Sequence, residues 1–141
     1  MRRETLVVST QHRKLRFPHR ETFRVINRVL RLESKRKLKI SVVFVDSRFI
    51  KRINLLFLRH NYVTDVIAFP LADGVGVDAE IHINLDRARR QAKECGVSFR
   101  EEVRRLLIHG TLHLLGYKDK TLRQKKTMKL REDHYLRLLR D

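Results

Sequence analysis

Apolar and polar positions along the chain follow two alternating periods, one typical of strands and one typical of helices. Between Leu38 and Val45, positions 38, 40, 42 and 44 are apolar, which predicts a strand with one face in a core. Between Pro18 and Leu32 the apolar residues recur at helical spacing, which predicts a helix. The same two patterns predict the strands Thr5–Ser9, Asp65–Phe69 and Ala79–Asn84, the helices Ser47–Leu58, Leu85–Glu94 and Thr121–Arg140, and a helix that starts after Ser98.

These elements occur in the order β-α-β-α-β-β-α-α-α. Only the loop Leu71–Val77 separates Asp65–Phe69 from Ala79–Asn84, so we expect these two strands to form an antiparallel pair or a long hairpin. The order predicts an α+β fold with one mixed β-sheet packed by helices. A length of 141 residues, a hydrophobic content of 42% and the absence of a linker-like tract predict a single domain over residues 1–141.

The helix after Ser98 is expected to be the central support of this fold. Ser98 and Glu101 match the S-x-x-E capping box at its start. His109 and His113 fall at the border of its apolar face, where a side chain is half covered by the core and half open to a cleft. The apolar face itself consists of Val103, Leu106, Leu107, Gly110 and Leu114.

The spacing of His109 and His113 predicts a metal site. At i and i+4 on a helix, both imidazoles can reach one ion from the same side. Gly116 lets the helix stop and the chain fold back, which brings Asp119 to the same ion. Two histidines, one carboxylate and an open position are typical of a catalytic Zn²⁺ centre. The alternative is a partly buried histidine pair without a metal.

Gly110 argues against peptide chemistry. In the zinc peptidase pattern H-E-x-x-H, the residue after the first histidine is the glutamate that deprotonates the attacking water. This chain has glycine there. A protein with this site must therefore activate water in another way.

The charge of the chain predicts an anionic partner. There are 33 Lys and Arg residues against 16 Asp and Glu residues, a formal net charge of +17. Nucleic acids favour such a protein through counterion release, whereas a membrane-surface protein would gather its charge on one amphipathic helix. Taken singly, each basic segment is better explained as a solvated helix face. The segments are His12–Arg20, Lys35–Lys39, Arg87–Lys93, Arg100–Arg105 and Lys118–Arg131.

Cys95 is the only cysteine, which excludes an intrachain disulfide and favours a reducing, cytoplasmic location. No apolar segment is long enough to span a membrane.

Three blocks of sequence resemble the YbeY family of bacterial rRNA-maturation endoribonucleases. The stretch from Ile108 to Asp119 is similar to the family's H-G-x-L-H-L-x-G-Y-D-H signature. Thr64–Pro70 resembles its P-T-D-V-L-S-F-P segment, preceded by Ile53-Asn54 where the family has Leu-Asn. Ala79–Ile83 stands where the family has G-D-I followed by alternating apolar residues.

This resemblance implies a zincin-like arrangement, with a metal-binding central helix against the sheet. It also implies a single-strand-specific, metal-dependent endoribonuclease with one Zn²⁺ per chain. The expected process is rRNA processing, including 16S rRNA 3′-end maturation and ribosome quality control, with the ribosome or its small subunit as partner.

The chain departs from the family pattern near the expected site. Asp119 stands where the family's third metal ligand is usually histidine, and it favours a harder ion than imidazole does. His134, on the last helix, is a second candidate for that ligand. Leu58 takes the place of an arginine held to matter for catalysis, and Arg59 follows one residue later. Val63 replaces the proline before Thr64.

We assign further roles to residues near the expected metal. Arg59, as a catalytic residue, and Lys118 and Lys120, in substrate binding, are expected to stabilise negative charge on the phosphate. Tyr117 is expected to bind substrate by stacking on an unpaired base, as is Phe69, although core packing is the alternative for both. We expect Thr64 and Asp65 to be structural hydrogen-bonding groups. Glu80 and His82 alternate with their neighbours along a strand, so at most one of the two sets faces the cleft.

Two other functions stay open from the sequence. One is a non-catalytic RNA- or ribosome-binding assembly factor with a structural metal, which the substitution at Asp119 favours. The other is a zinc hydrolase of peptides or small molecules, which Gly110 and the positive charge disfavour.

Overall fold

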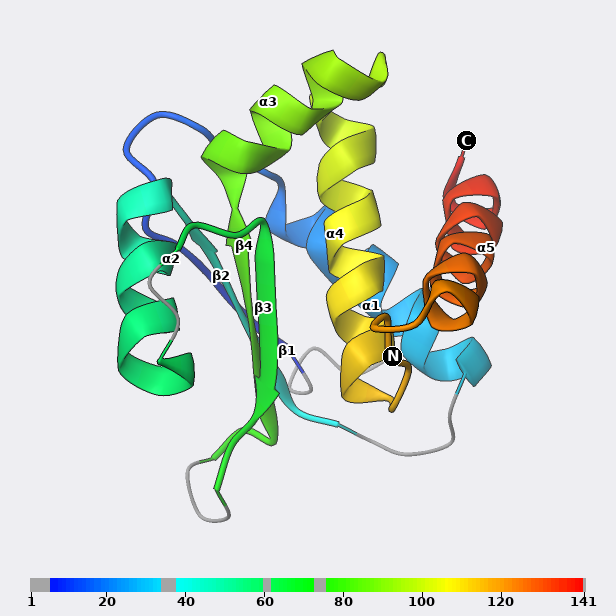
Figure 1. Cartoon of the computed structure of the whole chain (residues 1–141), viewed down its shortest axis with the longest axis horizontal. Helices are drawn as coiled ribbons and strands as arrows, with labels where there is room; N and C mark the ends of the chain where they lie inside the picture. Colours follow the sequence, from blue (N-terminus) through cyan, green and yellow to red (C-terminus); the bar gives the residue numbers. More distant parts are fainter. Residues whose placement is uncertain (1–5, 34–37, 60–61, 73–75, 141) are drawn as a thin grey trace.

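A computed structural model describes residues 6–33, 38–59, 62–72 and 76–140 of the chain. Three parts of the predicted elements lie outside the described residues: Thr5 of the first strand, residues 35–37 of the basic segment Lys35–Lys39, and residues 73–75 of the predicted loop. The helices and strands occur in the predicted order (Figure 1). They are β1 (Leu6–Thr10), α1 (His19–Glu33), β2 (Ile40–Val45), α2 (Ser47–Ile53), the π-helix η2 (Asn54–Leu58), β3 (Val66–Pro70), β4 (Ala79–Asn84), α3 (Leu85–Cys95), α4 (Phe99–Leu114) and α5 (Leu122–Leu139).

The four strands form one mixed sheet in the order β1-β2-β4-β3. β1 pairs with β2 and β2 with β4 in parallel, while β3 pairs antiparallel with β4. The sheet confirms the α+β class and the antiparallel pairing expected for the third and fourth strands. β3 is an edge strand, so its outer side is not covered by another strand of this sheet.

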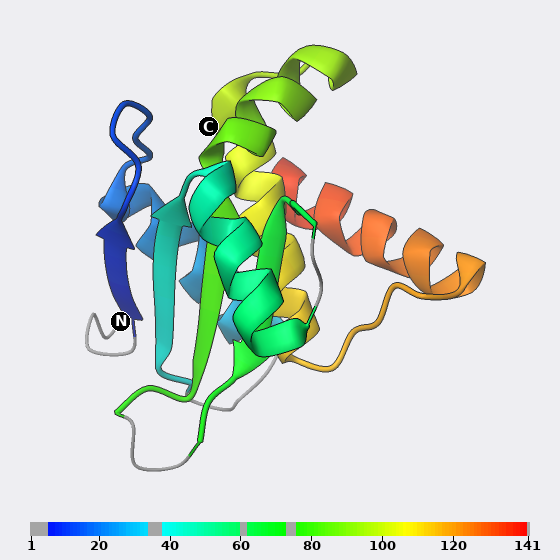
Figure 2. The same ribbon diagram turned by 60° about the vertical axis from the view of Figure 1, so that its left-hand side comes forward.

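Helices cover both faces of the sheet, but unequally (Figures 1 and 2). α1 and α4 pack on one face, and α5 packs on α4 from outside. Val42 and Ile81 point into this main core, whereas Val43 packs in a small second core under α2. On the other side of the strand expected at residues 38–45, Ser41 and Val43 are partly buried, whereas Lys39 is exposed. Side chains that alternate along one strand separate the two cores because successive residues point to opposite faces.

α4 approaches the sheet closely at Gly110. A Cβ atom at this position would lie 3.0 Å from Cγ2 of Ile81 and 3.4 Å from Cγ2 of Val66. Glycine therefore allows α4 to lie directly on β3 and β4. The same geometry shows that a side chain at position 110 would point into the sheet and not into a cleft.

The predicted starts of the last two helices are close to those observed. Ser98 accepts a hydrogen bond from the Glu101 backbone N–H, which is one half of the expected capping box. The Glu101 carboxylate lies 3.5 Å from Arg140. The full box occurs at α5, where Thr121 and Gln124 bond to each other's backbone. At the N-terminus of each of these two helices, a nearby side chain therefore accepts a hydrogen bond from a free backbone N–H group.

The helix predicted over Ser47–Leu58 has the expected length but changes type halfway. After Ile53 it continues as the π-helix η2, which ends at Arg59 in the left-handed conformation with φ 57°. The Asn54 side chain donates a hydrogen bond to the Tyr62 carbonyl at 2.9 Å, which connects the start of η2 with the chain that precedes β3. In the described part of the chain, no helix is long and apolar enough to cross a membrane.

We predict that enlarging residue 110 destabilises the protein in proportion to side-chain size. Gly110→Leu should lower the free energy of unfolding by about 1–3 kcal/mol through overpacking against Ile81 and Val66. Leucine is a good helix former, so a loss of stability cannot come from its helix propensity. Gly110→Ala should cost less, since helix propensity offsets part of the crowding. Urea denaturation measures both, and a Gly110→Leu variant as stable as the parent would contradict the close contact.

Candidate metal centre

Three side chains converge at the end of α4. The Nε2 atoms of His109 and His113 lie 3.0 Å apart, and each lies 3.4 Å from Oδ2 of Asp119. Ligand atoms at about 2.0–2.1 Å from a tetrahedral zinc ion stand roughly 3.3 Å from one another. The triangle therefore has the size that one ion requires. Among the described residues, these three form the group able to hold a metal.

The turn after α4 brings Asp119 to the histidines. α4 ends at Leu114, and Gly116 adopts φ +104°, a conformation that glycine accepts without strain. The Tyr117 N–H then donates to the Leu112 carbonyl at 3.0 Å, which closes the helix end. The predicted reversal at Gly116 is therefore present, and it directs the next residues back along the helix.

Tyr117 ties this turn to the rest of the protein. Its carbonyl accepts a hydrogen bond from Nδ1 of His113 at 2.9 Å, and its hydroxyl donates to the Glu33 carboxylate at 2.7 Å. Glu33 also accepts from Arg131 and Tyr135, which makes a connection between α1, α5 and the turn. The ring packs partly against the main core. Tyr117 thus orients a metal-ligand candidate, a role that the sequence did not suggest.

Glu132 holds the other histidine. Nδ1 of His109 donates to Oε2 of Glu132 at 2.6 Å, and Arg105 donates to Oε1 at 3.0 Å. The Glu132 side chain is buried. Hydrogen bonds from Nδ1 to a carboxylate or carbonyl orient metal-binding histidines and leave Nε2 as the ligand atom. The sequence carried one signal for Glu132, a carboxylate on the buried face of α5 between Met128 and Leu136.

The two Nδ1 bonds determine what the site can bind. With Nδ1 committed as donor in both rings, the neutral histidines direct two Nε2 lone pairs at one another and at the Asp119 carboxylate. Three facing acceptors are unfavourable unless a cation or a proton lies between them. These three ligand atoms therefore fit a divalent metal ion.

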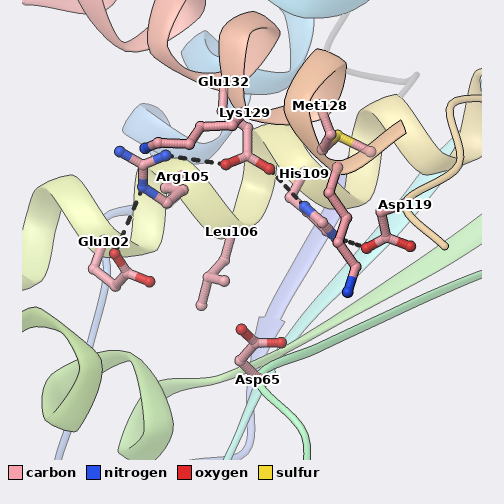
Figure 3. Close-up of a pocket in the computed structure, with 10 residues that line it drawn as sticks. Asp65, Glu102, Arg105, Leu106, His109, Asp119, Met128, Lys129 and Glu132 are labelled. Atoms are coloured by element: carbon pink, nitrogen blue, oxygen red, sulfur yellow. Dashed lines mark hydrogen bonds and ion pairs between the residues drawn. The ribbon is translucent and has the colours of Figure 1, made fainter. Parts of the chain in front are cut away.

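A cavity of about 300 Å³ lies beside the candidate ligands (Figure 3). α4 contributes Glu102, Arg105 and Leu106 to its wall, Asp65 lies on the strand side, and α5 lies opposite. The Asp65 carboxylate accepts a hydrogen bond from Gln91 at 3.3 Å, in keeping with the structural role expected of it, while it also faces the cavity. Burial raises the pKa of Glu102, and the hydrogen bond from Gln91 opposes this rise only in part.

Other residues singled out in the sequence lie around this centre or away from it. Lys118 and Lys120 are exposed on either side of Asp119. Arg59 is exposed at the end of η2, in the layer of α2 and across the sheet from α4 (Figure 1). The structure therefore brings together the three predicted ligands but not Arg59. His134 is absent from the described metal-binding group and packs against the Tyr135 ring.

Glu80 and His82 share one face of β4. His82 Nε2 lies 2.6 Å from the Glu80 carboxylate, and the His82 ring stacks between Phe49 and Phe69 on the α2 side of the sheet. These residues are thus on the face opposite to the metal centre. Phe69 is not beside the candidate ligands either.

Comparison with known proteins gives consistent relatives. The family model of Endoribonuclease YbeY matches residues 7–140. The Endoribonuclease YbeY of Chlorobaculum tepidum is 46% identical over 72% of this chain and 74% of its own length. That of Chloroherpeton thalassium is 37% identical over 89% of both chains, and that of Flavobacterium psychrophilum is 36% identical over 80% of this chain and 81% of its own.

A solved structure supports the fold independently. The solution structure of TM1509 from Thermotoga maritima superposes with a TM-score of 0.61 over 93% of this chain and 86% of that one. The two sequences are 23% identical, so the similarity concerns the fold alone.

We predict that Glu132→Gln weakens metal binding by about 10- to 100-fold, because the His109 ring loses its charged partner. Competition with a chromophoric chelator for Zn²⁺ measures the affinity. Asp133→Asn is the matched control. Asp133 lies next to Glu132 on α5 and accepts a hydrogen bond from Arg105 at 3.3 Å, but its carboxylate is not the partner of His109. Equal affinities of both variants and the parent would contradict an orienting role for Glu132.

We further predict a pH-dependent stability in the metal-free protein. Burial lowers the pKa of His109, but the Glu132 hydrogen bond and the charges of Glu132, Asp119 and Asp65 outweigh it and raise the pKa above its ordinary value of 6.5. A raised folded-state pKa adds stability below the unfolded-state pKa, and this stability is lost as the pH rises through the folded value.

The melting temperature without metal should therefore fall as the pH rises above about 6.5. His109→Gln should lack this fall. With Zn²⁺ bound, the dependence should reverse, because protons compete with the metal for Nε2. A metal-free melting temperature with the same pH dependence in the parent and in His109→Gln would count against the raised pKa.

Proposed function

Because this chain belongs to the Endoribonuclease YbeY family, we propose that it is a metal-dependent endoribonuclease that hydrolyses phosphodiester bonds of single-stranded RNA. The observation that carries this proposal is the triangle of His109, His113 and Asp119, with both histidines oriented from behind. A site with three protein ligands leaves a position for water or substrate, as catalytic zinc sites do.

We propose Zn²⁺ as the metal, with one ion per chain held by His109, His113 and Asp119. Imidazole nitrogen and carboxylate oxygen are both zinc ligands, and the spacing of the three atoms suits a tetrahedral ion. An aspartate as third ligand extends the range toward harder ions. When bound, the ion supplies Lewis-acid chemistry, which polarises a phosphoryl oxygen and lowers the pKa of a coordinated water.

The groups of the protein around the metal then have separate tasks. Glu132 and the Tyr117 carbonyl keep the Nε2 atoms of the two histidines directed at the ion. The exposed Lys118 and Lys120 flank Asp119 and would attract the phosphates next to the cleaved bond. Arg59 is proposed to stabilise negative charge on the substrate. An RNA strand that contacts both Arg59 and the ligands has to pass around the edge strand β3.

The proposed biological substrate is rRNA. A net charge of +17 suits a polyanion, and the family name describes an RNA-cleaving enzyme. We propose that the chain acts in the cytoplasm on the ribosome or its small subunit, in 16S rRNA 3′-end maturation and ribosome quality control.

One alternative is supported by particular residues. Asp119 replaces a histidine of the family signature, and Leu58 stands at the place of its arginine. A non-catalytic assembly factor that binds RNA or the ribosome and keeps a structural metal would tolerate both changes. Peptidase activity has no such support, because position 110 points into the sheet and cannot carry the base of a zinc peptidase.

We predict that the purified protein with one equivalent of Zn²⁺ cleaves a single-stranded RNA in a single-turnover assay. His113→Ala should reduce the rate at least about 100-fold, because the loss of one of three ligands removes the ion and its Lewis-acid chemistry. Lys126→Ala, an exposed change of one charge on α5, is the control. Equal cleavage by His113→Ala and the parent would refute the enzyme and leave the assembly factor.

A further inference from the structure

Large apolar side chains are exposed in one short segment of the protein. Among the described residues, Leu55, Leu56, Phe57 and Leu58 of η2 and Tyr62 after it are all exposed, and Phe57 is 64% exposed. A monomeric protein rarely leaves such a group of neighbouring apolar side chains in water unless the surface binds something. The segment follows α2, on the sheet face opposite to α4.

Phe57 is the outer end of a column of aromatic rings. Its ring stacks on Phe69 with centroids 6.1 Å apart and planes 18° apart. Phe69 stacks on His82 at 5.8 Å and 25°, and His82 stacks on Phe49 at 6.2 Å and 18°. The carboxylate of Glu80 holds the His82 ring at 2.6 Å. The inner rings are therefore constrained by the sheet and α2, while the last ring is open to solvent.

The segment that carries Phe49 and Phe57 is basic. Asp46 is the one acidic residue between positions 46 and 59, and its carboxylate caps α2 at the Phe49 N–H. The basic side chains of the segment are all exposed, namely Arg48, Lys51, Arg52 and Arg59. A second copy of this strongly positive chain would be repelled here. An occupant needs a planar ring for Phe57 and negative charge for the cations.

Single-stranded RNA has both properties. Each nucleotide carries one base with a π-face and one phosphate, and bases stack on protein aromatics without strong sequence preference. We propose that Phe57 is a stacking site for an unpaired base of the RNA substrate, with Lys51, Arg52 and Arg59 contacting the adjacent phosphates. This inference rests on the proposed function and extends the substrate-binding surface beyond the metal centre.

The edge strand β3 connects this surface with the metal centre. Asp65, just before β3, lines the cavity beside His109, whereas Phe69 near the other end of β3 belongs to the ring column. No strand of the described sheet covers the outer side of β3. An RNA strand can therefore pass around this edge from one face to the other. Phe69, proposed from the sequence as a stacking residue, lies inside the column, between Phe57 and His82.

The test compares variants of Phe57 in RNA binding. Fluorescence anisotropy with a labelled single-stranded 12-mer of uridines gives the Kd, measured in EDTA so that the proposed Zn²⁺-dependent activity does not cleave the RNA. Phe57→Ala and Phe57→Leu should both raise the Kd by about 5- to 100-fold, while Phe57→Trp should retain the parent value, because a base stacks on an aromatic face and not on an aliphatic side chain. Leu122→Ala, at an 86% exposed residue of α5, is the matched control for losing an exposed apolar side chain.

Salt dependence separates stacking from charge. Phe57→Ala should leave the slope of log Kd against log salt unchanged, whereas the double variant Lys51→Ala, Arg52→Ala should reduce it by about 1–2. Urea denaturation checks that each variant is as stable as the parent, which is expected because Phe57 is exposed.

Three outcomes would overturn the proposal: a parent that does not bind the RNA, a Phe57→Ala Kd equal to that of Leu122→Ala, or a Phe57→Leu Kd equal to the parent's. The last result would indicate an apolar protein partner in place of a base. A parent that binds RNA in the predicted order of variants but does not cleave it would instead refute the proposed enzyme and leave the stacking site intact.

Discussion

The direct contact between α4 and the sheet at Gly110 is the constraint on which the rest of the structure depends. A helix can hold two imidazoles at a cleft only if its other sides are packed. α4 packs on β3 and β4 and also contacts α1, α3 and α5. Because Gly110 has no side chain, the helix axis lies close to the strands and the adjacent His109 falls at the edge of the contact. The metal-site geometry is therefore a consequence of packing.

Buried carboxylates organise the helical side of this basic protein. Glu21, Glu102 and Glu132 are each buried, and each lies beside an arginine of α4. Removing a charge from water is costly. Hydrogen bonds from Arg104 to Glu21 and from Arg105 to Glu132 offset part of this cost, whereas burial still raises the pKa of Glu102. Glu132 uses its second oxygen for His109. Through Arg105, Glu102 and Glu132 connect the far end of the cavity with the candidate metal ligands, which makes α5 part of the site.

The two faces of the sheet have different chemistry. The face under α4 carries the main core and the histidines, whereas the face under α2 has a small core of aliphatic and aromatic side chains that is only partly closed. The π-helix η2 ends this smaller layer and leaves apolar side chains in solvent. The proposed stacking site gives this surface a physical use, since the edge strand β3 borders both faces.

The order of strands and helices, the i, i+4 histidine pair and the reversal at Gly116 followed from the sequence, because these depend on local periodicity and on the conformational freedom of one residue. The resemblance to the family also rests on contiguous residues. The partner of His109 could not be predicted, because Glu132 lies 23 positions away and only the packing of α5 on α4 brings it within 2.6 Å. The ring column was equally hidden, since its members come from α2, η2, β3 and β4. Local pattern thus determined which residues can bind a metal, and tertiary packing decided how they are oriented and which surfaces remain exposed to a substrate.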